Sequence, residues 1–427
     1  MHNEYAGVTT RFLNPNERLV LSKENEMPFV IEAKEDNSVQ FLQAFLISNT
    51  DKILNDMSHY GAVLLRGFNI VSEEDFETTV LSIRGMKGIS EAFMSEQGRI
   101  HVGNSKYVLH TNAVYKTGGT LYLGGFHSEN YYSTDVPTYI SFCCLKPSST
   151  GGETGIINME KIYPFLDQAL QTKLEKNNFF VSKWLMSEVA ERYHLSDKKI
   201  EAICKQFDLP VVTVNDKKFI LMYKPNVFIH PVTNKKSLQI NYFELPTLNA
   251  VLRKKFIKDY PGKMWFWHRF VWRLPDAVLK IPEVIYMVFA SLFYSPKESF
   301  KIIVSKYKNY MANRKNKDSL PFNDVKVKSC FNEKEIKALA QLMRDYYCSC
   351  LWQKGDILLV DNRKVVHAGM PGSGPRTIRA MICNPLDMRY SDPQSGLFDC
   401  KSRNSETVGF YMSSPESEGV KSAEYTI

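Results

Sequence analysis

Short runs of strand-forming residues, separated by turn residues, place the strongest limit on the fold of this chain. Three of them are GAVLLRGF at 61–68, TYISFCCL at 138–145 and GDILLVDN at 355–362. Others occur between 219 and 243, and TIRAMIC occupies 377–383. Runs of this length that are rich in β-branched and aromatic residues favour strands over helices. We therefore predict an α+β protein with a double-stranded β-helix core (a distorted jelly roll), flanking helices and a helical insertion.

Helix signals lie outside these runs. A helix is predicted over 39–54, another after the N-cap residue Ser72, and further helices over 160–207. The predicted domain boundaries follow from this arrangement. They define an N-terminal arm (1–54), a core in two parts (55–250 and 321–390), an aromatic and basic insertion (251–320) and a C-terminal tail (391–427).

The composition is typical of a soluble globular protein, with 44% hydrophobic and 23% charged residues in a chain of 427. Eight cysteines occur without CxxC spacing, so free thiols in a reducing cytoplasm are expected. The N-terminus lacks the apolar segment and cleavage site of a secretory signal. A net charge of +8 favours an acidic partner, but no nucleic-acid-binding motif accompanies it. We predict a cytoplasmic protein that does not bind nucleic acid.

The insertion contains MWFWHRFVWRLP, followed by an apolar run at 281–294. That run includes a proline and a glutamate and is shorter than the roughly 20 residues that a membrane-spanning helix needs. The preferred interpretation is a lid over the core, which predicts that Trp265, Trp267 and Trp272 are shielded from solvent. Membrane contact through 264–294 and a protein-docking surface are the alternatives, and neither is favoured.

His127-Ser-Glu129 is the first candidate metal site. A chain with nine histidines and 46 acidic residues can contain such a pair by chance, and His2-Asn-Glu4 is a second copy. The pair at 127 differs because it follows the glycine-rich run LYLGGF, where a backbone bend can aim two alternating side chains at one point. The glycine-rich run before His127 strengthens the prediction of a metal site, which the His-x-Glu pair alone supports only weakly.

The second candidate segment is WQKGDILLVDNRKVVHAGMPGSGPRTIRAM at 352–381. A predicted strand is followed by His367 and then by Arg376. Non-haem Fe(II) oxygenases use two histidines and one carboxylate on one face of the metal, which leaves positions for a 2-oxoacid and dioxygen. His127, Glu129 and His367 have this composition. An arginine close after the distal histidine can form a forked pair with the far carboxylate of 2-oxoglutarate.

Gly151-Gly-Glu-Thr154-Gly follows Glu129 along the chain. One interpretation is a simple hairpin turn. The other is a turn that presents the Thr154 hydroxyl to the same cosubstrate.

Four segments together resemble the TauD/TfdA family of 2-oxoglutarate dioxygenases, and within it the SyrP-like branch. They are GAVLLRGF, HSENYYSTDVPTYISFCCLKPSSTGGETGIINMEKIYPFL, HPVTNKKSLQINYF and WQKGDILLVDNRKVVHAGMPGSGPRTI. The resemblance covers about 55–250 and 320–385 and places Asn241 on the family's asparagine. The resemblance implies that Fe(II) binds to His127, Glu129 and His367.

The resemblance also implies that 2-oxoglutarate binds Thr154 and an arginine, with O2 as the second cosubstrate. The GPR match favours Arg376, and Arg379 is the alternative in a shifted register. The implied reaction is hydroxylation of an unactivated carbon of an amino-acid-like small molecule, possibly tethered to an acidic carrier protein, with release of succinate and CO2. Glu129 occupies the position that a halogenase leaves open.

Two other outcomes stay open from the sequence. The enzyme can give desaturation or cyclisation instead of hydroxylation, or the barrel can be an inactive binding or scaffold protein.

The remaining polar candidates are expected to be structural. His110 and His230 are predicted to be satisfied core histidines, and Asp356 to be a turn residue. For Arg66 a buried ion pair and a role in the pocket are equally plausible.

Overall fold

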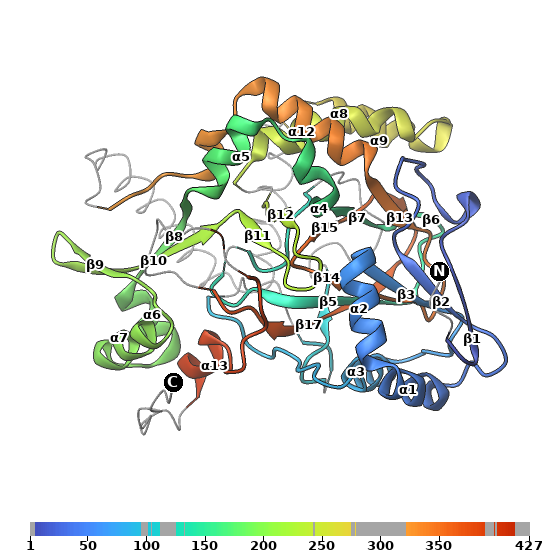
Figure 1. Cartoon of the computed structure of the whole chain (residues 1–427), viewed down its shortest axis with the longest axis horizontal. Coiled ribbons are helices and arrows are strands. Elements are labelled where there is room, and N and C mark those ends of the chain that lie inside the picture. Colours follow the sequence, from blue (N-terminus) through green and yellow to red (C-terminus); the bar gives the residue numbers. More distant parts are fainter. Residues whose placement is uncertain are drawn as a thin grey trace. The chain divides into compact units, whose positions relative to one another are not determined.

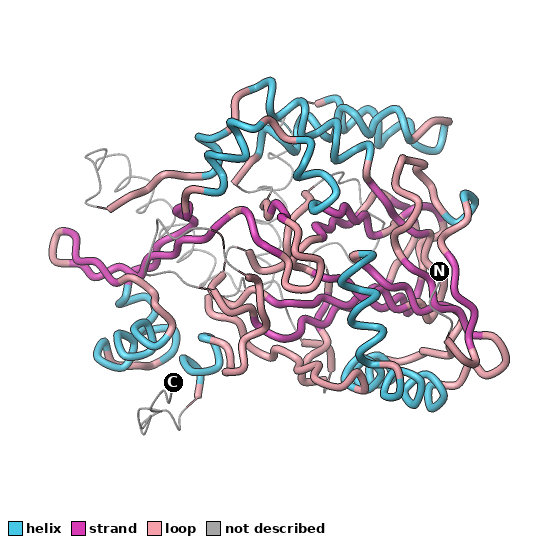
Figure 2. The backbone as a smooth tube through the Cα atoms, viewed as in Figure 1, coloured by secondary structure: helices cyan, strands magenta, loops and turns pink. Residues whose placement is uncertain are grey.

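The computed structural model describes residues 5–94, 101–103, 105–111, 125–131, 133–241, 244–274, 278, 322–388, 397 and 399–414. The chain divides into two compact units. The first unit comprises 1–256 and 325–427, and the second comprises 257–324. Figure 1 shows the chain coloured along the sequence, and Figure 2 shows the same view by secondary structure.

Strands make up the centre of the first unit (Figure 1). They are β1 (Val8–Arg11), β2 (Phe29–Ala33), β3 (Ala62–Arg66), β4 (Leu109–His110), β5 (Pro137–Lys146), β6 (Thr150–Gly151), β7 (Thr154–Asn158), β8 (Asn178–Leu185), β9 (Val211–Val214), β10 (Lys217–Pro225), β11 (Val227–Ile229), β12 (Lys236–Leu238), β13 (Tyr347–Cys350), β14 (Ile357–Asp361), β15 (Val365–Gly369), β16 (Gly372–Ser373) and β17 (Thr377–Pro385).

The helices of the first unit lie outside these strands. They are η1 (Pro15–Glu17), α1 (Val39–Ser48), α2 (Thr50–Tyr60), α3 (Glu73–Leu81), α4 (Met159–Ile162), η2 (Tyr163–Phe165), α5 (Gln168–Glu175), α6 (Met186–Tyr193), α7 (Asp197–Gln206), α8 (Pro246–Phe256), η5 (Val327–Cys330), α12 (Glu333–Asp345) and α13 (Val408–Ser413). The predicted helix after Ser72 is confirmed as α3, whose capping box joins Ser72 and Asp75.

The largest sheet has seven strands in the order β1-β2-β3-β14-β5-β17-β4. All of its strand pairs are antiparallel except β2 with β3. β3 lies next to β14, with Val63 opposite Leu359. Every residue of β3 is buried, which explains why the four residues before Arg66 are an unbroken apolar run and not an alternating one.

Alternate residues of β3 belong to different cores. Val63 and Leu65 pack with apolar residues of α1, α2 and α3 on one face of the large sheet. Ala62 and Leu64 face the other way and pack with the three-stranded sheet β13-β7-β15, which contributes Ile156. This alternation follows from the two-residue period of a strand. The space between the two sheets is the core that positions the site described below.

The predicted mixture of helices and strands is confirmed, and the strands of the described residues form five separate sheets with no closed barrel.

The prediction of helices over 160–207 is wrong for residues 178–185, which form β8. This segment, NFFVSKWL, is rich in aromatic and β-branched residues and pairs with β10, from Pro225 opposite Asn178 to Phe219 opposite Leu185. These residues favour a strand locally, but helical sequence on both sides masks the signal, and pairing with a strand about 40 residues later stabilises the strand.

All eight cysteines are buried free thiols, as expected from their spacing. Among the described residues, no helix is long and apolar enough to cross a membrane.

The second unit is described for η3 (Ile257–Asp259), η4 (Lys263–Trp265) and α9 (Phe266–Arg273). The prediction that the three tryptophans are shielded holds for Trp265 and Trp272, which are buried. It is wrong for Trp267, whose exposed fraction is 69%. The predicted apolar run at 281–294 lies outside the described residues.

Candidate metal centre

His127 and His367 meet through their backbones. The N–H of His127 donates to the carbonyl of His367 at 3.1 Å, and the N–H of His367 donates to the carbonyl of His127 at 3.0 Å. Residues that exchange both bonds stand directly opposite each other in an antiparallel pair, so their side chains share one face. The two imidazole rings accordingly lie 4.5 Å apart between centroids. Strand pairing therefore brings together two histidines that are distant in the sequence.

Glu129 completes a cluster with these histidines. Its Oε2 lies 3.9 Å from Nε2 of His127 and 3.3 Å from Nε2 of His367. One potential ligand atom from each residue lies within 4.8 Å of the others. Ligand atoms that bind a metal at about 2.1 Å stand about 3 Å apart, so small side-chain movements suffice. The donor set, two imidazole nitrogens and one carboxylate, fits a non-haem iron ion.

A glycine fixes the orientation of His127. The Nδ1–H of His127 donates to the carbonyl of Gly125 at 2.7 Å, which makes Nε2 the nitrogen that can bind a metal. Gly125 has φ of 76°, a left-handed conformation that a glycine adopts without strain. The bend expected at the end of LYLGGF is thus present at Gly125, and residues 121–124 lie outside the described part.

Asn362 holds Glu129 in place, and the sequence reasoning did not identify it as a site residue. Its Oδ1 accepts the N–H of Glu129 at 2.7 Å, and its Nδ2 donates to the carbonyl of Pro137 at 2.8 Å. Nδ2 also lies 3.3 Å from the carbonyl of Glu129. The available signal was an asparagine directly after a buried strand, where an amide needs partners that replace water.

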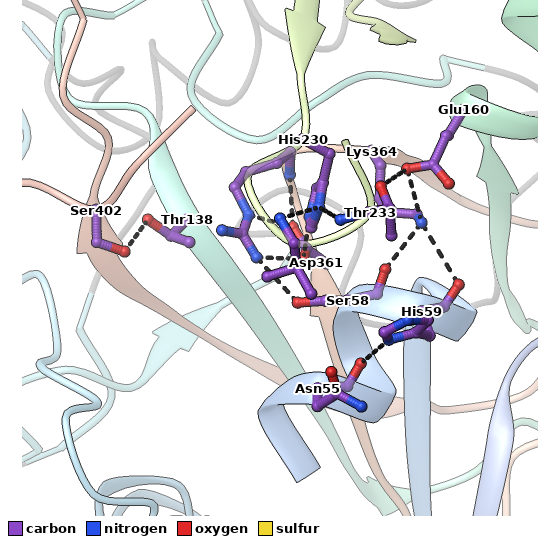
Figure 3. Close-up of polar contacts among 12 residues, drawn as sticks. Asn55, Ser58, His59, Thr138, Glu160, His230, Thr233, Asp361, Lys364 and Ser402 are labelled. Atoms are coloured by element: carbon purple, nitrogen blue, oxygen red, sulfur yellow. Dashed lines mark hydrogen bonds and ion pairs between the residues drawn. The ribbon is translucent and has the colours of Figure 1, made fainter. Parts of the chain in front are cut away.

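Asp361, the neighbour of Asn362, is the centre of a buried polar network (Figure 3). Its carboxylate accepts bonds from Nε2 of His230 at 2.9 Å and from Nε of Arg363 at 2.8 Å. Burial alone raises the pKa of Asp361, but the Arg363 guanidinium and His230 outweigh this and hold the pKa below its ordinary value. The carboxylate is therefore charged and fully paired.

His230 is a satisfied structural histidine, as predicted. Its Nδ1 lies 3.3 Å from the backbone N–H groups of Val232 and Thr233, which can only donate. Nδ1 is consequently the acceptor, and the proton sits on Nε2, where it is donated to Asp361. Figure 3 shows His230 above Asp361.

Lys364 ties the same turn to two helices. Its Nζ lies 3.0 Å from Oε2 of Glu160 in α4 and donates to the carbonyl of Ser58 in α2 at 2.9 Å (Figure 3). Thr233 donates to the same Glu160 oxygen at 2.6 Å. Each of the four residues from 361 to 364 is buried and anchored, so the turn that leads to His367 is fixed on several sides.

Thr154 and Arg376 lie beside the same glycine. Thr154 is opposite Gly369 in the pairing of β7 with β15. A Cβ atom added to Gly369 would lie 3.8 Å from Nη2 of Arg376, and Nη1 of Arg376 donates to the carbonyl of Gly152. Gly369 is two residues after His367 and on the same strand face. The structure thus brings Thr154 and Arg376 to the side of the histidine cluster.

Arg376 is partly desolvated. Burial lowers its pKa, and Cys144 and Glu153 offset that shift only in part. Among the described residues, no carboxylate lies within ion-pair distance of its guanidinium. A half-buried, partly desolvated arginine in this state favours an anionic ligand.

Arg379 has a different environment. Ile378 and Ala380 point into the core between the sheets, so Arg379 between them points to the opposite face. There its Nη2 lies 2.8 Å from a carboxylate oxygen of Glu73 in α3. The structure does not bring Arg379 to the histidine cluster.

Arg66 and Asp356 also form a structural pair. Nη2 of Arg66 lies 2.7 Å from Asp356 with both side chains buried, and Nη1 lies 2.6 Å from Glu17. Asp356 is therefore a partner of Arg66 besides being a turn residue. His110 lies in β4, with Nδ1 3.4 Å from Arg379.

Similar structures are known. The chain is similar to AAD-2 in complex with Mn(II) and N-oxalylglycine, at 13% identity and a TM-score of 0.41, covering 91% of this chain and 99% of that chain. A taurine dioxygenase from Burkholderia xenovorans is 10% identical with a TM-score of 0.45, covering 95% of this chain and 98% of that chain. PvcB from Pseudomonas aeruginosa is 10% identical with a TM-score of 0.42, covering 90% of this chain and 92% of that chain.

None of the curated proteins is similar enough in sequence to match the chain. The model of the "Taurine catabolism dioxygenase TauD, TfdA family" matches residues 27–261. Enzymes of this family use Fe(II), 2-oxoglutarate and O2. Since the match spans more than half of its residues, the chain belongs to the TauD/TfdA family of iron- and 2-oxoglutarate-dependent dioxygenases.

Proposed function

We propose that this chain oxidises a small molecule at an unactivated carbon, with His127, Glu129 and His367 holding Fe(II). The clustering of two imidazole nitrogens and one carboxylate within 4.8 Å is the observation that carries the proposal. Three ligands on one face of the metal leave sites for a 2-oxoacid and for dioxygen. The bound iron, with 2-oxoglutarate and O2, supplies the oxidation, and succinate and CO2 are released.

Arg376 and Thr154 are proposed to hold the cosubstrate. The partly desolvated guanidinium of Arg376, which has no carboxylate partner among the described residues, suits the far carboxylate of 2-oxoglutarate. It can bind this carboxylate through two parallel N–H groups. Thr154 lies beside the same glycine and offers a hydroxyl. Arg379, paired with Glu73 on the other sheet face, is not part of this proposal.

The protein itself fixes the geometry of the ligands. Gly125 selects the tautomer of His127, and Asn362 holds the backbone of Glu129. The ring of Phe142 packs against His367 at 5.1 Å between centroids and provides an apolar wall on that side. Hydroxylation is proposed over halogenation because Glu129 fills the metal position that a halide would need.

The finer expectations from the family resemblance stay proposals. They are an amino-acid-like substrate, an acidic carrier protein as its possible holder, and a cytoplasmic location, which the eight buried thiols favour. We also propose that the seven-stranded sheet and the sheet β13-β7-β15 are the two halves of a distorted jelly roll, since they share one core.

Two measurements test the proposal. One is the formation of succinate from 2-oxoglutarate, and the other is the amount of Fe(II) that the protein retains after dialysis. His127→Ala and His367→Ala should each lose both, whereas His59→Ala, which changes an exposed histidine on α2, should keep both. Near-normal turnover in either ligand variant would remove the assignment. Free amino acids and carrier-bound aminoacyl thioesters can then be screened for a mass gain of one oxygen atom.

A further inference from the structure

Helix α9 has two aromatic faces. At 3.6 residues per turn, His268 and Trp272 fall on one side of the helix, and Phe266, Trp267 and Phe270 fall on the other. The first pair is buried. The three residues of the second set have exposed fractions of 56%, 69% and 52%.

The inner face packs against residues of its own unit. The Tyr260 ring lies 4.9 Å from Trp265 and 5.1 Å from Trp272, and the ring of His268 lies 4.8 Å from Trp265. Nη1 of Arg269 donates to the carbonyl of Gly262 at 2.8 Å, which closes the preceding turn onto the helix. This inner cluster forms without the outer aromatic side chains.

The outer residues form one continuous patch. The Phe266 and Trp267 rings lie 5.4 Å apart, and the Trp267 and Phe270 rings lie 6.2 Å apart. Met264, with an exposed fraction of 60%, precedes them in the sequence. Single exposed apolar residues are ordinary, but a group of neighbouring aromatic side chains marks an interaction surface.

The charges around this patch are basic. Lys258, Lys263 and Arg273 are exposed, and Asp259 is the one acidic residue in the sequence from 257 to 274. The whole segment 257–324 contains 12 Lys and Arg against 6 Asp and Glu, so it carries +6 of the chain's net charge of +8. An exposed aromatic surface with a basic surround is complementary to an anionic, partly apolar partner.

We propose that α9 binds the surface of an anionic phospholipid membrane, with Phe266, Trp267 and Phe270 at the level of the headgroups. Tryptophan beside lysine and arginine suits that layer, which is apolar on one side and charged on the other. The eight residues of α9 are far too few to cross a bilayer, so the helix lies in the plane of the surface. An acidic protein would use the same charges, and the vesicle measurements below distinguish the two partners.

This binding site is independent of the reaction at the metal centre. The family match ends at residue 261, before the patch begins, so the patch is a property of this chain beyond that match. Its function would be to hold the enzyme at the membrane surface.

Sedimentation of the full-length protein with lipid vesicles tests the proposal. We expect binding to vesicles of phosphatidylcholine with phosphatidylserine, and weak binding to phosphatidylcholine alone. The double variant Trp267→Ser/Phe270→Ser should lower the affinity by at least about tenfold. Its matched control is Phe165→Ser, which removes an aromatic side chain that is 61% exposed and belongs to the first unit.

Charge reversal tests the electrostatic contribution to vesicle binding. Lys263→Glu/Arg273→Glu should weaken binding to the anionic vesicles, and Lys198→Glu/Lys205→Glu, on exposed positions of α7, should not. Succinate formation without vesicles should be equal in all variants and wild type.

Three results would overturn the proposal. The first is that the wild type does not bind anionic vesicles. The second is that Trp267→Ser/Phe270→Ser binds them as tightly as the wild type does. The third is loss of vesicle-free turnover in that variant with vesicle binding unaltered, which would identify a lid. Binding of an acidic carrier protein, with none to vesicles, falls under the first result and would assign the patch to a protein partner.

Discussion

Replacing Asn362 by alanine should damage the metal centre without touching a metal ligand. The amide of Asn362 is buried and bonds three backbone groups, the N–H and carbonyl of Glu129 and the carbonyl of Pro137. The alanine variant leaves the N–H of Glu129 and the carbonyl of Pro137 without their partner. Each buried polar group left unsatisfied costs about 1–3 kcal/mol, so the free energy of unfolding should fall by about 2–6 kcal/mol.

The affinity for Fe(II) should fall as well, because the backbone of Glu129 is then free to move. Loss of a group that orients a metal ligand typically costs about 10- to 100-fold in affinity. Urea unfolding of the metal-free protein measures the first effect, and equilibrium dialysis with Fe(II) under anaerobic conditions measures the second.

Asn384→Gly is the matched control for this variant. The Asn384 amide also bonds two backbone groups, at Lys87 and Gly85, and glycine tolerates its φ of 55°. We expect this control to lose stability and to keep its Fe(II) affinity. Equal Fe(II) affinity in Asn362→Ala and wild type would refute the positioning role of Asn362.

Three further predictions concern the surrounding residues. Arg376→Ala should weaken 2-oxoglutarate binding by about 2–5 kcal/mol, measured by cosubstrate titration, whereas Arg379→Ala should leave it unchanged. Burial raises the pKa of Glu153 from 4.5 to about 7. The folded state therefore keeps this proton longer, so stability falls as pH rises from 4.5 to about 7, by up to about 3 kcal/mol. Glu153→Gln should remove that dependence in unfolding curves at several pH values. His230→Ala should cost about 1.5–3 kcal/mol in urea unfolding by removing a bond to the charged Asp361, and an unchanged midpoint would contradict this.

The central strands could be predicted from the sequence because their signals are local. GAVLLRGF and TIRAMIC contain enough apolar and β-branched residues to form β3 and β17 in place. β8 was not predicted, because its helix-like neighbours and lysine obscure its local strand signal, and its pairing with β10 stabilises the strand. Sheet pairing between distant segments has no local signal.

The candidate ligands could be predicted from residue type and spacing. The family resemblance favoured Arg376 over Arg379, but the physical reason for that choice lies in the fold. Alternation along β17 directs Ile378 and Ala380 into the core and Arg379 to the other face. Where β17 begins, its pairing with β5 is irregular, because Thr377 pairs with Lys146 and Ile378 with Cys144. A bulge of this kind depends on the partner strand β5. Asn362 was missed for a similar reason, since its partner Glu129 is 233 residues away in the sequence.

The separation of His127 from His367 along the chain also sets when the proposed iron site can be completed. During synthesis at about 5–20 residues per second, the segment of His127 and Glu129 precedes the segment of His367 by about 10–50 s. Until β15 pairs with the segment of His127, the growing chain lacks the second histidine of the proposed site. A site with two of its three ligands binds metal weakly, so the proposed centre would take up iron only after this long-range pairing has formed.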